Sequence, residues 1–181
     1  MKDLSLHILD IVQNSLKAEA KLIEIEITES KINNYYKIVI RDDGNGMSKE
    51  MLAIVTDPFT TSRTTRKVGL GLSLYKHMAE LAGGGLRIDS ELGKGTEVEV
   101  NMKYDHLDRP PIGDIAGVIT ILISANINSE FIYRHLTDHG EYVFNTREVK
   151  EVLEDVNLNS PKIVSYIKDM INENLKEIKV F

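Results

Sequence analysis

The sequence predicts an α+β fold, a two-layer sandwich in which one mixed, mostly antiparallel sheet carries helices on one face. Two hairpins carry this prediction. Apolar residues recur at every second position over residues 23–27 and 36–40, and the polar link between the two runs makes them a hairpin. Residues 86–91 and 96–104 form a second hairpin around a glycine-containing turn. Because helical patterns stand between these hairpins, we expect the helices to cover one face of the sheet.

Helical patterns account for most of the remaining sequence before residue 85. Apolar side chains at helical spacing predict a helix over residues 3–18. Ser48 stands where a cap would start a short helix that ends at Val55. A third helix is expected over residues 70–81, and the glycines at 83–85 end it.

The sequence Arg109-Pro110-Pro111 marks a linker, so we expect two domains, residues 1–108 and a small α+β extension of residues 109–181 that acts as an interaction module. The unbroken apolar run from Val118 to Ser124 predicts a buried strand. We expect it to pack against the sheet of the first domain or against a second copy of the chain. The other expected elements are a hairpin of residues 131–137 and 141–144, a helix over 145–155 and a final helix from Ser160.

Composition limits the function classes. The 181 residues contain no cysteine, which excludes disulfides and thiolate metal sites. The net charge of −6 argues against a general nucleic-acid binder. No apolar run is long enough for a membrane helix, and the amino terminus lacks the apolar stretch of a signal peptide. We therefore expect a cytoplasmic protein that binds neither nucleic acid nor membrane.

Three separated segments carry residues suited to a nucleotide. In the first, Asp10 and Asn14 lie four residues apart and share a helix face, and the Asn14 side-chain oxygen is a hard ligand of the kind that magnesium accepts. In the second, Asp42 ends a strand and enters a turn in which Gly44 and Gly46 allow a close backbone approach. Alone, these would be solvated helix residues and an ordinary turn.

The third segment runs from Asp57 to Leu72. Asp57-Pro58-Phe59 precedes eight residues, 60–67, that hold three cations and five hydroxyls, and Gly69 and Gly71 then open a helix. A helix amino terminus with free N–H groups, reinforced by basic side chains, is suited to phosphate. In isolation, the alternative is a disordered basic loop.

In this order and spacing the segments, closed by Gly93-Lys94-Gly95-Thr96, resemble the N, G1, F, G2 and G3 boxes of the Bergerat fold. That fold belongs to the GHKL superfamily of gyrase, heat-shock chaperone, histidine-kinase and mismatch-repair ATPases. The resemblance covers roughly residues 1–103 and implies a histidine-kinase-like domain that binds ATP and magnesium. The first helix begins almost at Met1, which leaves no room for a phosphoacceptor hairpin, so we expect a stand-alone protein of a small bacterial type.

The resemblance also implies a role for individual residues. Asn14 would hold magnesium, and Lys17 would lie against the phosphates. Asp42 would accept a hydrogen bond from the adenine amino group, and Thr96 would complete adenine recognition. Asp10 stands where related ATPases carry a general-base glutamate. The other expected nucleotide-binding residues are Gly44, Gly46, Met47, Phe59, Thr60, Thr61, Arg63, Arg66, Lys67, Gly69, Leu70, Gly71 and Leu72.

Two positions depart from the family pattern. Asp10 is one methylene shorter than glutamate, so its carboxylate reaches less far toward an attacking water. Val68 stands at the first glycine of the family's Gly-x-Gly-x-Gly run, within the segment that the family uses as a mobile lid over the triphosphate.

Two functions follow from the resemblance. The first is a protein kinase that acts in trans, or a slow ATPase, in bacterial signalling. The alternative is a non-hydrolysing, ATP-gated protein-binding module that resembles anti-sigma factors. The expected partners are ATP and an unidentified protein, and the extension could also support a homodimer. Turnover of ATP distinguishes the two.

Overall fold

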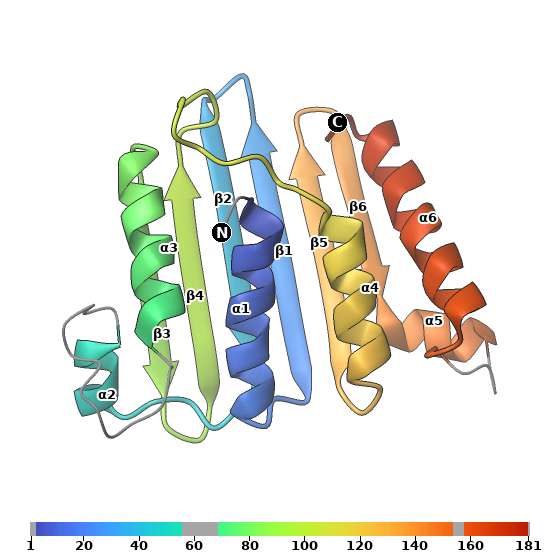
Figure 1. Ribbon diagram of the computed structural model, residues 1–181, viewed down its shortest axis with the longest axis horizontal. Helices are drawn as coiled ribbons and strands as arrows, with labels where there is room; N and C mark the ends of the chain where they lie inside the picture. The colour runs from blue at the N-terminus through green and yellow to red at the C-terminus, as the bar shows by residue number, and fades with distance from the viewer. Residues whose placement is uncertain (1–2, 56–68, 154–157, 181) are drawn as a thin grey trace.

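A computed structural model describes residues 3–55, 69–153 and 158–180. One six-stranded sheet with the order β3-β4-β2-β1-β5-β6 carries helices on one face (Figure 1). The α+β two-layer architecture expected from the sequence is therefore confirmed. The helices are α1 (Leu4–Lys17), α2 (Lys49–Ile54), α3 (Gly69–Leu81), α4 (Ile115–Ala125), α5 (Thr146–Leu153) and α6 (Pro161–Glu177). The strands are β1 (Leu22–Ser30), β2 (Tyr35–Asp42), β3 (Gly85–Glu91), β4 (Gly95–Met102), β5 (Glu130–Thr137) and β6 (Gly140–Asn145).

Strand pairing follows the alternation in the sequence. The pairs β1–β2, β2–β4, β3–β4 and β5–β6 are antiparallel, and β1 pairs with β5 in parallel. Ile25 of β1 lies between Ile40 of β2 and Tyr133 of β5. All three side chains are buried, because alternate residues of each strand face the helix layer.

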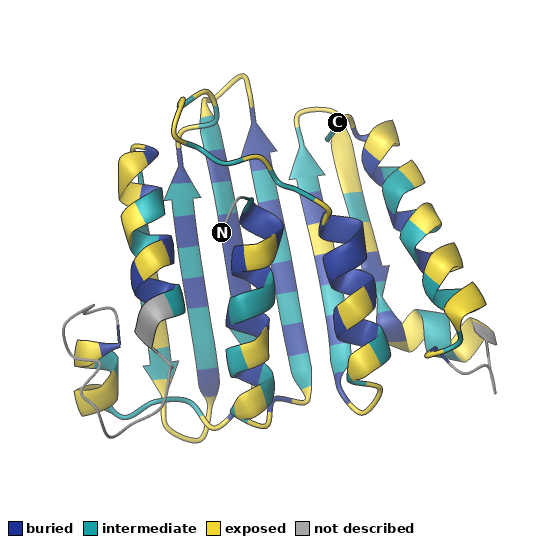
Figure 2. Ribbon diagram, in the orientation of Figure 1, coloured by how far each residue is buried: buried dark blue, intermediate teal, exposed yellow. Residues whose placement is uncertain are grey.

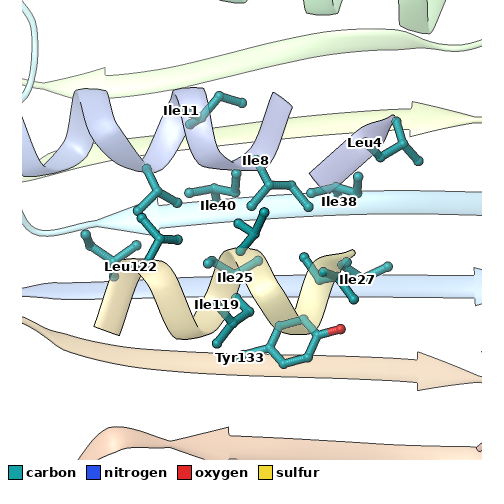
Figure 3. Packing of buried hydrophobic residues seen from close by; sticks show 14 of the residues in the cluster. Leu4, Ile8, Ile11, Ile25, Ile27, Ile38, Ile40, Ile119, Leu122 and Tyr133 are labelled. Atoms are coloured by element: carbon teal, nitrogen blue, oxygen red, sulfur yellow. The ribbon is translucent and has the colours of Figure 1, made fainter. Parts of the chain in front are cut away.

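The core lies between this face of the sheet and the helices. Figure 3 shows Ile8 and Ile11 of α1 above the central strands and Ile119 and Leu122 of α4 above their neighbours. In Figure 2 the central strands alternate between buried and less buried residues, and buried residues recur along α1 and α4. Among the described residues, no helix combines the length and the apolar character needed to cross a bilayer.

The strand predicted over residues 118–124 is wrong, because this segment belongs to helix α4. The Asp114 side chain caps the helix by accepting a hydrogen bond from the Gly117 N–H over 2.9 Å. An unbroken apolar run has no period to distinguish a helix from a strand. Here nearly all sides of the helix are apolar, because α4 packs against α1, α6 and β5.

The segment after residue 109 continues the same sheet, since β5 pairs with β1 from Leu22 opposite Glu130 to Thr28 opposite Leu136. The hairpin expected from the sequence is β5 and β6, joined by the two-residue turn at Asp138 and His139. The division into two domains at residue 109 stays a prediction.

A histidine links the first and third helices. His7 of α1 stacks on Tyr75 of α3, with ring centroids 4.6 Å apart and an angle of 9° between the ring planes. The His7 side chain is buried, and this burial lowers its pKa below the usual value although the charges of Asp10 and Asp3 act in the opposite direction. The folded protein therefore favours the neutral imidazole.

This burial predicts a loss of stability in acid. Because the pKa of His7 is lower in the folded than in the unfolded chain, the unfolded chain binds more protons as the pH falls below about 6.5. The free energy of unfolding should then fall by up to about 1.4 kcal/mol per pH unit from this group. His7→Phe, which keeps a stacked ring, should flatten this dependence in urea unfolding, whereas His77→Phe on the exposed face of α3 should not. Equal pH slopes for the two variants would contradict the assignment to His7.

Candidate functional site

A cavity of about 310 Å³ lies between α1, α2, the carboxyl end of β2 and β4. Its wall is mostly apolar, with a few polar side chains among the apolar ones, as in small-molecule sites. Seven of the residues expected from the sequence line it: Asn14, Lys17, Asp42, Gly46, Met47, Leu72 and Thr96. The other lining residues are Ile11, Ser15, Ala18, Asn45, Met51, Val55 and Val98.

Helix periodicity explains how α1 serves both the core and the cavity. Ile8 and Val12 are fully buried under the helix, whereas Asn14 is half-buried and Lys17 is exposed at its last turn. A turn of 3.6 residues turns these two polar side chains away from the buried stripe of the helix. Both line the cavity.

The Asp42 carboxylate is held by two hydrogen bonds. The Ser15 hydroxyl donates to Oδ2 over 2.5 Å, and the Gly44 N–H donates to Oδ1 over 2.9 Å. Each carboxylate oxygen has a second lone pair, so Asp42 keeps the capacity to accept a further donor at the cavity. The sequence interpretation missed Ser15, although a serine on the apolar stripe of the helix, four residues after Ile11, was a signal.

Ser90, which the sequence interpretation also missed, connects the turn after β2 to the turn between β3 and β4. Its hydroxyl accepts a hydrogen bond from the Met47 N–H over 2.8 Å and donates to the Gly95 carbonyl over 2.9 Å. The Thr96 hydroxyl lies 2.9 Å from the Ser90 hydroxyl oxygen. Ser90 thus fixes Met47 and Thr96 relative to each other at the cavity.

Two glycines allow these turns to meet. Gly46 has φ +63°, and a Cβ there would lie 2.1 Å from the Glu91 carbonyl oxygen. Gly95 has φ +112°, and a Cβ there would lie 1.9 Å from the Asp42 carbonyl oxygen. Both the left-handed backbone and the close approach therefore require glycine. The expected Gly44 is buried beside them.

Asp10 lies one helical turn before Asn14 and is not among the residues that line the cavity. Its carboxylate faces the first turn of α3, where a Cβ on Gly71 would lie 2.5 Å from Asp10 Oδ2. Gly71 therefore leaves the space that the Asp10 side chain occupies, and α1 and α3 approach each other closely at this point.

Part of the expected site lies outside the described residues. The residues concerned are Asp57-Pro58-Phe59, Thr60, Thr61, Arg63, Arg66, Lys67 and Val68. Gly69 and Leu70 form the first turn of α3. Within the described part of the chain, no group of three or more histidine, aspartate and glutamate side chains is arranged to hold a metal ion.

Comparison with known proteins identifies a family that matches more than half of the chain. Residues 2–106 match the family model described as histidine kinase-, DNA gyrase B-, and HSP90-like ATPase. The chain is 34% identical over 99 residues to the histidine protein kinase DivJ of Caulobacter vibrioides, and 33% identical over 95 residues to sporulation kinase D of Bacillus subtilis. Each match covers 52% of this chain, but only 17% of DivJ and 19% of sporulation kinase D.

A solved structure shares the fold beyond the matched family region. The amino-terminal domain of a DNA repair protein superposes with a TM-score of 0.56 at 18% identity, covering 79% of this chain and 52% of that one. At this identity the likeness concerns the fold alone.

The close approach at Gly95 predicts that a methyl group there disrupts the site. Gly95→Ala should lower the free energy of unfolding by about 1–3 kcal/mol, because it combines a strained φ with a clash against backbone. Gly85→Ala is the matched control, since a Cβ there meets nothing within 4 Å. Urea denaturation measures both variants. Similar stabilities for the two would show that the turns can separate at little cost.

Proposed function

The chain belongs to the family of histidine kinase-, DNA gyrase B-, and HSP90-like ATPases, and from this premise we propose that the cavity beside α1 binds ATP together with magnesium. One observation carries the proposal: Asn14, Asp42 and Thr96, which are far apart in the sequence, line the same cavity. Each comes from a different one of the segments that resemble nucleotide-binding boxes.

The arrangement suits an adenine ring. Ile11, Met47 and Val98 supply apolar wall, and Asp42 supplies a fixed acceptor for the exocyclic amino group. We assign the base to this end of the cavity, with Thr96 beside it. Ser15 acts on the base through Asp42, because its hydrogen bond holds one carboxylate oxygen in place.

The phosphates are assigned to the end of the cavity at Asn14 and Lys17. The Asn14 amide oxygen would hold magnesium, which when bound neutralises phosphate charge. Lys17 would add a positive charge at the last turn of α1. The basic segment of residues 60–67 is the expected source of further phosphate contacts.

For the biological role, we propose a protein kinase that acts in trans, or a slow ATPase, in bacterial signalling, with a protein partner still to be identified. The support comes from relatives named as histidine kinases. The position of Asp10 favours the alternative, an ATP-gated binding module without hydrolysis, because this carboxylate lies against Gly71 and does not line the cavity.

Adenine recognition is tested by substitution at Asp42. Asp42→Asn should weaken ATP affinity by about tenfold or more, because an amide offers only one acceptor oxygen and adds a donor. Isothermal titration calorimetry with and without magnesium measures this. Asn14→Ala is the matched variant. It should reduce the effect of magnesium on ATP affinity more than it reduces the affinity for adenosine. Unchanged ATP affinity in Asp42→Asn would rule out the proposed site.

The two biological roles are separated by Asp10→Asn. If Asp10 is the base for slow hydrolysis, this variant should lose turnover of labelled ATP while its ATP affinity stays within about twofold, since a base must reach its water by a hydrogen bond. Turnover that survives would exclude Asp10 as the base. An absence of turnover in the unmodified chain, with or without host lysate, would favour the gated binding module.

A further inference from the structure

Two serines set the direction of the hydrogen bonds at the carboxyl end of β2. The first is Ser15 of α1, which is 4% exposed and whose hydroxyl has one proton to donate. The Ile11 carbonyl lies 3.5 Å from this hydroxyl and the Asp42 Oδ2 atom only 2.5 Å from it. The proton therefore goes to the carboxylate, because the shorter contact is the stronger hydrogen bond.

The Asp42 carboxylate is left with acceptor capacity alone. Its Oδ1 atom receives the Gly44 N–H and its Oδ2 atom receives the Ser15 hydroxyl, and an ionised carboxylate has no proton to give. Rotation about the bond to a carboxylate carbon is otherwise soft. One donor on each oxygen fixes the carboxylate plane, so its remaining lone pairs are held ready at the cavity that Asp42 lines.

The second serine, Ser90, has the same effect on Thr96, which lies directly opposite Asp42 in the pairing of β2 with β4. The Ser90 hydroxyl donates its one proton to the Gly95 carbonyl over 2.9 Å. The hydrogen bond between the Ser90 and Thr96 hydroxyls, also 2.9 Å long, must then use the Thr96 proton. Thr96 is thereby also left with lone pairs alone.

Two neighbouring acceptors select the chemistry of the base. An amino group carries two N–H donors and suits both acceptors, whereas a carbonyl group brings a third acceptor and leaves Asp42 and Thr96 without partners. A site built to bond an N–H group rejects an analogue that lacks it, because the polar groups of the site then stay unpaired.

We propose that Ser15 and Ser90 determine base specificity, because they make this end of the cavity accept hydrogen bonds only. The cavity then selects a purine with an amino group at C6 over a purine with a carbonyl there. Ser15 acts through Asp42 and Ser90 acts through Thr96, so both are positioning residues. The inference rests on the proposed binding of ATP and adds which bases the cavity refuses.

Isothermal titration calorimetry with magnesium compares three triphosphates. They are ATP, inosine triphosphate with a carbonyl at C6, and purine riboside triphosphate with only a hydrogen at C6. The unmodified chain should bind ATP more tightly than inosine triphosphate by about tenfold or more. Ser15→Ala should weaken ATP by about threefold or more, because the carboxylate can then rotate, and should leave purine riboside triphosphate unaffected.

Ser90→Ala tests the second acceptor. Without the Ser90 oxygen the Thr96 hydroxyl keeps its proton free for a carbonyl group. The affinity for inosine triphosphate should therefore rise relative to the affinity for ATP. Ser15→Cys preserves the volume of the buried side chain with a weaker donor, so its preference for ATP should lie between those of the unmodified chain and Ser15→Ala.

Ser5→Ala is the matched control, because Ser5 lies on the same helix, is 2% exposed and donates to Asp3 Oδ1 over 2.7 Å without lining the cavity. It should leave the ratio of ATP to inosine triphosphate affinity within about twofold. In an Asp42→Asn background, Ser15→Ala should likewise change this ratio by less than about twofold, since the acceptor through which Ser15 acts is gone.

An equal loss of affinity for all three triphosphates in Ser15→Ala would give Ser15 a structural role only and overturn the inference. A ratio of ATP to inosine triphosphate affinity that is unchanged in both Ser15→Ala and Ser90→Ala would also overturn it. Both outcomes leave ATP binding by the unmodified chain intact. A lack of ATP binding in the unmodified chain would instead overturn the proposed function together with this inference.

Discussion

The packing of α1 on β1 and β2 is the constraint on which the rest of the molecule depends. Leu4, Ile8 and Val12 are fully buried at this contact, and Figure 3 shows α1 beside Ile38 and Ile40 of β2. The helix cannot rotate without exposing these side chains to water. Its remaining faces are thereby fixed, one toward the candidate cavity and α3, the other toward α4.

The same contact determines the geometry of the cavity. Because α1 is held against β2, Ser15 comes within hydrogen-bond distance of Asp42 at the end of that strand. The Ala18 carbonyl accepts from the Asn45 N–H over 2.8 Å, so the end of α1 also holds the glycine turn. The polar groups of the site are thus positioned by buried apolar packing a few ångströms away.

A second set of contacts attaches the segment after residue 109. The Arg109 guanidinium lies 4.8 Å from the Tyr36 ring centroid and 4.9 Å from that of Tyr104, and the Leu4 N–H donates to the Pro111 carbonyl. Farther along, His135 lies 2.8 Å from Glu29 and 2.7 Å from the Tyr133 hydroxyl, all on the buried face. A register shift of β5 against β1 would leave these polar groups buried without partners, so the cluster specifies the parallel pairing.

The sequence by itself determined the local elements that have a clear period or a stop signal, and the residue types of the nucleotide boxes. The alternation over residues 23–27 and 36–40 was sufficient for the first hairpin, because a period of two fits only a strand with one buried face. The run from Val118 to Ser124 has no period, so only the surrounding helices and sheet decided that it is helical. The sequence likewise could not show that Ser15 and Ser90 hold Asp42 and Met47, or that Asp10 faces Gly71. These contacts join residues that are distant along the chain, and their distances are set by the packing of whole elements, which no local pattern records.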